Sequence, residues 1–256
     1  MSIIYIPAGR ALEYAQLAAN LWDGCVHGCL YCWSVLLAMR QGRKREDFFG
    51  SANPRKDVLR KLESDARRLA GDPRPVHLCF TCDPYPPAES ELGITQQAIE
   101  ILMAHGLRVE ILTKAGHLPI RDLGLLASKP GNRCGATLTG ISVTEALRWE
   151  PGAASPWARL DYLYAAHQRG ISTKISLEPV VDPAASLAVI VAANSFIDHF
   201  AVGKLNYHPK AKEIDWPAFR AASIERLEAL GFRRLKDPHG DRAGKTYYVK
   251  KDLEAA

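Results

Sequence analysis

The chain has 256 residues, of which 47% are apolar and 24% are charged, so it has the composition of a globular protein with a sizeable core. No apolar run reaches the roughly 18 residues of a membrane span, and the N-terminal segment lacks the features of a signal peptide. The formal net charge of +5 permits a polyanionic partner without demanding one. We therefore expect one α/β barrel-type domain or two small domains, in a cytoplasmic protein with reduced cysteines and no membrane association.

A cysteine-rich loop follows the first predicted strand. The strand is expected over the apolar residues 17–22. Directly after it, Cys25, Cys29 and Cys32 have the spacing C-x3-C-x2-C. Thiolates this close in a glycine-bearing loop can converge on one metal centre, and cysteine is the usual ligand of iron–sulfur clusters. The alternative is a structural zinc loop, which would need His27 or a distant cysteine as its fourth ligand.

The segment after the loop is predicted to be helical and basic. One helix is expected from Ser34 to Arg40, and a glycine with several cations then interrupts it at 40–45. A second helix is expected from about Asn53, as its N-cap, to Leu69. Ten basic and five acidic residues lie between positions 40 and 68. They form either a solvated helix face or a surface that contacts phosphates.

From residue 76 onward, predicted strands and helices alternate. The strands are expected over 76–82, 107–114, 136–143, 171–177 and 196–202, and the helices over 95–105, 118–127, 156–169 and 183–193. Ser155 before the third of these helices and Gly170 after it are typical residues for a helix start and end. With the first strand, six strands alternate with helices, which predicts parallel βαβ units.

Polar side chains recur where the predicted strands end. They are the cysteine loop, Asp83, Lys114, the segment 142–145, Glu178, Lys204 and Asn206. Because the C-terminal ends of parallel strands meet at one edge of a barrel, we expect a single catalytic rim. Taken alone, Lys114, Glu178 and Lys204 are each also compatible with ordinary surface charges.

The end of the chain departs from this alternation. An amphipathic helix is expected over 216–230, followed by a basic tail with a last strand near Tyr247. We therefore expect a barrel over residues 1–214. Residues 215–256 would then form a C-terminal helix and basic tail that packs on the barrel and either closes it or contacts the substrate.

Several motifs resemble those of radical S-adenosylmethionine enzymes, and within them the spore photoproduct lyase-like group, which includes DNA repair photolyase-like proteins. The motifs are the segments 24–33, 80–89, 112–114, 141–143 and 149–152, in this order. The resemblance implies an α/β fold of the TIM-like type, a partial (β/α)6 barrel with a small C-terminal appendage. It also implies a [4Fe–4S] cluster held by Cys25, Cys29 and Cys32, with S-adenosylmethionine bound at the fourth iron.

The resemblance further implies a set of cofactor-binding residues. The backbone around Tyr31 would face the adenine, and Thr81 and Asp83 would lie near the methionine end. Lys114, Ser142 and Arg159 are the remaining contacts that the resemblance implies. Glu178 is added as a candidate because it ends the fifth predicted strand.

The radical chemistry of the group implies a hydrogen donor and an electron donor. The lyase uses a cysteine at the end of its second strand, where this chain has Phe80 between Cys79 and Cys82. Either cysteine is a catalytic candidate, or both are small buried hydrophobes, as is Cys134. Strand alternation predicts that Cys79 and Cys82 point to opposite faces, so that at most one enters the barrel. Tyr85 is either a radical relay or a packing residue, and a flavodoxin or ferredoxin is the expected reductant.

Three functional hypotheses follow from the sequence. The first is a radical S-adenosylmethionine enzyme, lyase-like, that repairs or modifies a nucleic acid. The second is the same chemistry on a peptide or small molecule. The third is a non-catalytic, metal-containing module that binds nucleic acid, which predicts a closed fourth ligand and indifference to S-adenosylmethionine.

Overall fold

A nine-stranded sheet forms the centre of the computed structural model, which describes residues 2–256. The strand order is β1 (Ile4–Tyr5), β2 (Leu17–Ala19), β5 (Val76–Leu78), β6 (Val109–Thr113), β7 (Arg133–Thr137), β8 (Ser172–Leu177), β9 (His199–Val202), β11 (Thr246–Val249) and β10 (Arg233–Arg234). Only β1 is antiparallel to its neighbour, and every other adjacent pair in this sheet is parallel. The sheet is therefore the parallel α/β arrangement that the alternation predicts.

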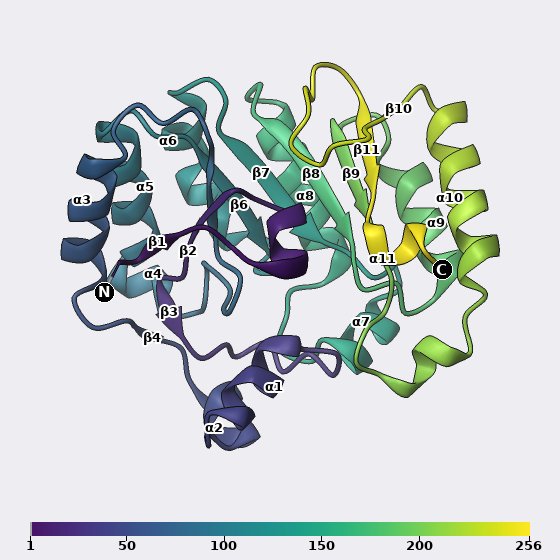
Figure 1. Cartoon of the computed structure of the whole chain (residues 1–256), viewed down its shortest axis with the longest axis horizontal. Coiled ribbons are helices and arrows are strands. Elements are labelled where there is room, and N and C mark those ends of the chain that lie inside the picture. The colour runs from purple at the N-terminus through teal and green to yellow at the C-terminus, as the bar shows by residue number, and fades with distance from the viewer. Residues whose placement is uncertain (1) are drawn as a thin grey trace.

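Helices cover one face of the sheet and extend from its rim. They are α1 (Trp33–Arg40), α2 (Arg45–Gly50), α3 (Val58–Arg68), α4 (Glu89–Leu92), α5 (Ile94–Ala104), α6 (Leu123–Ala127), α7 (Val143–Trp149), α8 (Pro156–His167), α9 (Pro183–Ala193), α10 (Trp216–Ala229) and α11 (Lys251–Glu254), with 3₁₀ turns at Gly9–Glu13, Leu118–Asp122 and Pro209–Lys212. In Figure 1, α3 and α5 lie at one end of the sheet and α9 and α10 at the other, while α1 and α2 protrude below it. None of the helices within residues 2–256 has the length and apolarity that crossing a membrane requires.

The predicted six-strand barrel is confirmed, and the tail extends it. The six expected strands correspond to β2, β5, β6, β7, β8 and β9. The tail then adds β11 parallel to β9, with Thr246 opposite His199, so the sheet continues past the expected boundary at residue 214. As a result, the residue that follows β11, Lys250, reaches the same rim as the residues that follow the earlier strands.

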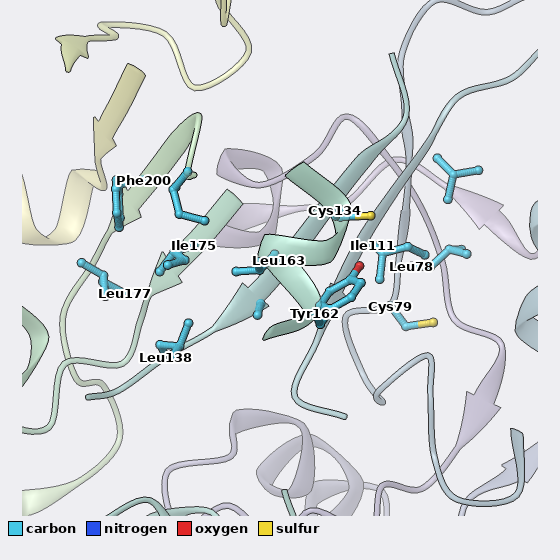
Figure 2. Close-up of a cluster of buried hydrophobic side chains, with 14 of the residues drawn as sticks. Leu78, Cys79, Ile111, Cys134, Leu138, Tyr162, Leu163, Ile175, Leu177 and Phe200 are labelled. Atoms are coloured by element: carbon cyan, nitrogen blue, oxygen red, sulfur yellow. The ribbon is translucent and has the colours of Figure 1, made fainter. Parts of the chain in front are cut away.

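Alternate strand residues form the hydrophobic core on the helix side of the sheet. Leu78, Ile111 and Ile175 are fully buried there. Figure 2 shows these side chains gathered around Tyr162 and Leu163 of α8, which crosses the middle of the sheet. This core fixes the strands, and thereby the positions of the residues that follow them.

The intervening strand residues face the barrel interior, and three of them are charged: Glu110, Arg133 and Lys174. Glu110 is 2% exposed and accepts from Lys174 Nζ at 2.7 Å and from Arg133 Nη1 at 3.2 Å, while Arg242 Nη1 from the tail lies 3.5 Å away. The His77 ring lies 3.7 Å from the same carboxylate. We call these five residues the Glu110 cluster. It lies inside the barrel, on residues of the neighbouring strands β5, β6, β7 and β8 and of the tail.

Two local predictions are wrong. Asn53 does not cap a helix: it pairs in the short β4 (Asn53–Pro54) with β3 (Trp22–Asp23), and α3 begins only after Asp57, which has a φ of 55°. The fourth predicted strand ends at Thr137, not Val143, and α7 begins after Ser142. Ser142 Oγ accepts from the backbone N–H of Glu145 at 3.3 Å, the S-x-x-E capping arrangement that starts a helix.

Candidate active site

A cavity of about 430 Å³ opens at the C-terminal ends of the strands. Most of the predicted site residues line it: Cys25, Cys29, Tyr31, Cys32, Cys79, Thr81, Cys82, Asp83, Lys114 and Glu178. Lys204 and Asn206 of the predicted rim also line it. The expectation that residues after successive strands meet at one rim therefore agrees with the geometry, and the cavity has the size of a small-molecule site.

The cysteine loop is held against two other segments by its backbone. Cys25 N–H donates to Phe48 O at 3.0 Å, and Leu30 N–H donates to Trp149 O at 2.9 Å. Gly152 packs so closely on the loop that a Cβ there would stand 2.2 Å from Val26 O. The Trp-Glu-Pro-Gly motif at 149–152 therefore supports the loop from behind, and leaves its sulfur atoms facing the cavity.

The three loop cysteines are all free and lie along the cavity wall. Among residues 2–256, no three His, Cys, Asp or Glu side chains stand close enough to hold one metal ion. A zinc site needs four ligands that meet at one ion, at about 2.0–2.3 Å, whereas a [4Fe–4S] cluster spreads its cysteines over separate irons. The donor set on this cavity wall, three cysteine thiols, is the ligand type of an iron–sulfur cluster.

Burial keeps two of these thiols protonated before a metal binds. It raises the pKa of Cys29 to about 12, and it raises the pKa of Cys25 even further. A metal centre must displace these protons, because the thiolate is the ligand form. In the unligated loop, Cys25 and Cys29 therefore carry neutral thiols at physiological pH.

Tyr31 is anchored by a buried ion pair. Its hydroxyl donates to Glu150, which lies 2.5 Å from Arg159 Nη2, and both of these charged side chains are almost fully buried. Burial acts to raise the pKa of Glu150, but Arg159 and Lys114 outweigh it, so the pKa is lowered and the group stays a carboxylate. Arg159 does not line the cavity, and instead donates to Ala154 O and Thr137 O behind the loop.

Asp83 joins the ends of two neighbouring strands. Its carboxylate accepts from Thr113 Oγ1 at 2.7 Å and from the Lys114 backbone N–H at 2.8 Å. His27 Nδ1 of the cysteine loop lies 3.5 Å from the same carboxylate. Asp83 therefore fixes the relative positions of the cysteine loop and the Lys114 side chain, whose Nζ lies 5.8 Å from the centre of the Tyr31 ring.

The prediction that Cys79 and Cys82 face opposite sides is wrong. Because β5 ends at Leu78, strand alternation does not extend to Cys82, and both cysteines line the same cavity. Tyr85 does not line it: its hydroxyl donates to the buried Asp122 at 2.9 Å, in the manner of a packing residue. Ser142 also lies outside the lining, because it caps α7.

Sequence reasoning missed several residues that line the cavity, among them Tyr14 and Lys250. The Tyr14 hydroxyl donates to Glu178 and is hydrogen-bonded to Ser176 Oγ at 2.7 Å. Lys250 Nζ lies 2.7 Å from Glu178 and 4.1 Å from the centre of the Tyr14 ring. No local pattern marks either residue, because Lys250 reaches the rim only through the pairing of β11 with β9.

The architecture defines a fold: a parallel α/β half-barrel of this kind also occurs in solved structures of radical S-adenosylmethionine enzymes. Searches against protein-family models and against curated proteins find no match for the chain. Solved structures do match it. A variant of spore photoproduct lyase aligns with a TM-score of 0.66 and 13% identity, over 96% of this chain and 79% of that one.

Two further structures extend the comparison. Spore photoproduct lyase complexed with dinucleoside spore photoproduct gives a TM-score of 0.63 and 14% identity, over 96% of this chain and 79% of that one. SuiB of Streptococcus suis, bound to S-adenosylmethionine, gives a TM-score of 0.62 and 10% identity, over 91% of this chain and 45% of that one. At these identities the likeness establishes the fold alone.

Proposed function

We propose that the chain is a radical S-adenosylmethionine enzyme. The observation that carries the proposal is the set of three free cysteines on the wall of an open cavity, at the strand-end rim of this fold. When bound, a [4Fe–4S] cluster and S-adenosylmethionine supply a 5′-deoxyadenosyl radical that removes a hydrogen atom from the substrate. SuiB, of similar fold, has been solved with S-adenosylmethionine, which supports the choice of cofactor.

The residues of this chain have distinct tasks in the proposal. Cys25, Cys29 and Cys32 hold the cluster through their thiolates. Lys114, beside the Tyr31 ring, offers a cation to the carboxylate end of the cofactor. The ion pair behind Tyr31 anchors the loop through the Tyr31 hydroxyl, and so would keep the three cysteines in place for the cluster.

The cavity lining favours an anionic, aromatic substrate. Its cations are Arg10, Lys114, Lys204 and Lys250, against the carboxylates Asp83 and Glu178. Aromatic rings suited to stacking on bases also line it: Tyr14, Tyr31, Trp33, Phe80 and Tyr207. Together with the printed complex of spore photoproduct lyase with a dinucleoside photoproduct, these features support a nucleic-acid substrate for repair or modification.

A second candidate substrate class is a peptide or small molecule. The observation that favours it is the ion pair between Lys250 and Glu178, which both line the cavity. Such a pair can recognise an ammonium and a carboxylate group at once. In either case an external one-electron donor, such as a flavodoxin or ferredoxin, supplies the electron.

Cluster assembly tests the metal part of the proposal. Anaerobic reconstitution with iron and sulfide should give a brown protein with about four irons per chain. Cys29→Ala should bleach it, whereas Cys134→Ala, which changes a buried cysteine outside the cavity, should leave the colour intact. A colourless wild-type protein, or a brown Cys29→Ala variant, would contradict the proposal.

A substrate panel tests the second part. Ultraviolet-irradiated DNA, intact DNA, RNA and a mixed peptide library are each added to the reconstituted protein with S-adenosylmethionine and a reductant. The nucleic-acid hypothesis predicts that DNA raises cofactor consumption above the rate without substrate, and that the peptides do not. Stimulation by peptides alone would favour the second candidate.

A further inference from the structure

The segment that joins β1 to β2 crosses from one end of the sheet to the other. β1 is one edge strand of the nine-stranded sheet, and β11 lies beside β10 at the opposite edge. The 3₁₀ turn Gly9–Glu13, which follows β1, nevertheless contacts residues in and next to β11. In Figure 1 this turn lies in front of the middle of the sheet. We call residues 8–14 the strap, because they bridge the two ends of the sheet.

The strap forms part of the cavity wall. Four of its residues line the cavity: Ala8, Arg10, Ala11 and Tyr14. None of the residues from Gly9 to Glu13 is buried, and Leu12 is 42% exposed. The strap is therefore a single layer of chain between the cavity and the solvent.

Polar contacts with the tail hold the strap in place. Glu13 Oε2 accepts from the Tyr248 hydroxyl at 3.0 Å and from the Lys251 backbone N–H at 2.9 Å. Arg10 Nη1 lies 3.3 Å from Asp252. We call these contacts of Glu13 and Arg10 the latch. The latch joins the N-terminal segment to the tail across the barrel.

The two ends of the strap differ in how firmly they are held. At its C-terminal end, the Tyr14 hydroxyl is hydrogen-bonded to Ser176 Oγ at 2.7 Å and donates to Glu178. At its N-terminal end, Gly9 has a φ of 60°, in the region that favours glycine, and a Cβ there would have no heavy atom within 4 Å. Residues 9–13 therefore lie between a firm anchor and a glycine with room to change its dihedral angles, as a hinge requires.

The strap lacks the contacts that would fix it permanently. It buries no side chain between Gly9 and Glu13, so the hydrophobic effect contributes little to holding these residues. The Arg10 side chain is 49% exposed, and an ion pair this open to water adds little stability. The backbone adds one contact, because His239 Nε2 lies 2.7 Å from Leu12 O. A segment with so few buried apolar contacts opens locally, without unfolding of the whole protein.

We propose that the strap is a gate that controls access to the cavity from the side of the barrel, and that Glu13 latches this gate to the tail. The inference goes beyond the proposed function, because it concerns access and applies to any ligand of the cavity. With the strap latched, a ligand enters at the strand-end rim. With the strap open, the side of the cavity is also exposed, so larger ligands reach its wall. The gate thereby sets the size of the ligands that the cavity admits.

Native-state hydrogen exchange of the full-length protein, without any cofactor, measures how often the strap opens. We expect the amides of residues 9–15 to exchange much faster than those of α8, at a rate that low urea concentrations do not change, because local opening exposes little surface. Glu13→Ala removes both acceptor contacts of Glu13, and should raise the exchange rate of the strap at least about fivefold. Strap amides that exchange only through global unfolding, at the rate of α8, would overturn the proposal.

Thiol labelling of the same protein tests whether opening gives access to the cavity. Cys79 and Cys82 line the cavity, are 6% and 8% exposed, and both fall in the tryptic peptide 69–108. Fluorescein maleimide, a bulky reagent, should label this peptide faster in Glu13→Ala than in the wild-type protein, by about the same factor as the strap amides, because both rates scale with the opening equilibrium. The peptide that carries the fully buried Cys134 should stay unlabelled. Faster exchange of the strap with unchanged labelling of 69–108 would show that the strap does not control access.

Strand β11 offers a matched control. Tyr247, the neighbour of Tyr248 and on the opposite face of the strand, donates to Glu228 of α10 at 2.8 Å. Glu228→Ala therefore removes the same kind of contact away from the strap and should leave both rates unchanged. Tyr248→Phe removes one of the two donors to Glu13, and should act in the same direction as Glu13→Ala but less strongly. Equal acceleration in Glu228→Ala would overturn the proposal, because a general loosening of the tail would then explain the effect.

Discussion

The Glu110 cluster gives the most specific prediction about stability, because one carboxylate forms ion pairs with three cations inside the barrel. Glu110→Gln keeps the shape of the side chain and removes its charge. Lys174, which is 2% exposed and 2.7 Å away, then loses its main partner. Removing one partner of a buried pair costs about 3–5 kcal/mol, since the other charge remains buried and uncompensated. For a chain of this size, that cost lowers the melting temperature by roughly 6–20 °C.

Thermal and urea unfolding, followed by circular dichroism, measure this loss directly. The matched control is Glu145→Gln, which breaks an exposed 4.0 Å pair with Arg148 and should have no measurable effect. Adding Lys174→Met to Glu110→Gln removes the unpaired charge and should restore part of the stability. A loss below about 1 kcal/mol for Glu110→Gln would refute the reasoning, because the cluster would then be solvated.

Three further predictions concern pH, the cysteine loop and its support. Burial first, and then nearby cations, hold the pKa of His199 well below its usual value, so only the unfolded chain takes up its proton below about pH 6.5. Stability should therefore fall as the pH drops from about 7 to 5, and His199→Gln should flatten this slope in urea unfolding; an unchanged slope would contradict the assignment. Arg159→Met should lower the free energy of unfolding by about 3–5 kcal/mol in the same assay, because it leaves Glu150 buried without its cation. If the variant loses less stability than a variant of an exposed arginine, the buried pair does not have this role. Gly152→Ala should lower the iron content after reconstitution, because its Cβ would collide with the backbone of the cysteine loop, whereas Gly124→Ala, with open space around it, should not; equal iron in both variants would argue against the support role.

The fold could be predicted from the sequence because each βα unit has its own local sequence pattern. Apolar strands alternate with capped helices, and the predicted helix 183–193 has the bounds of α9. Strand ends were less accurate, since the apolar run that predicted a strand over 76–82 includes the bend that begins at Cys79. The helix α7 was missed although Ser142 and Glu145 form a capping pair, because the run before it is rich in β-branched residues.

The site was predictable only where it depends on residues that follow strands. The triplet, Asp83, Lys114 and Glu178 meet in one cavity because parallel strands end at one edge. Lys250 was not predictable in this way, since the position of β11 beside β9 is a long-range pairing that no local pattern encodes. The charged barrel interior did leave a signal in the sequence that was overlooked. Glu110 and Lys174 each interrupt an apolar strand, at positions whose side chains point to the same face of the sheet.

Formation of 5′-deoxyadenosine by the anaerobically reconstituted protein tests the central claim most directly. The protein is incubated with S-adenosylmethionine and a strong reductant, and the nucleoside is quantified by chromatography and mass spectrometry, with and without DNA. We expect the wild-type protein to form it and the Cys29→Ala variant not to form it. If a protein with its full complement of iron forms no 5′-deoxyadenosine under either condition, the assignment of the cavity to radical chemistry is wrong.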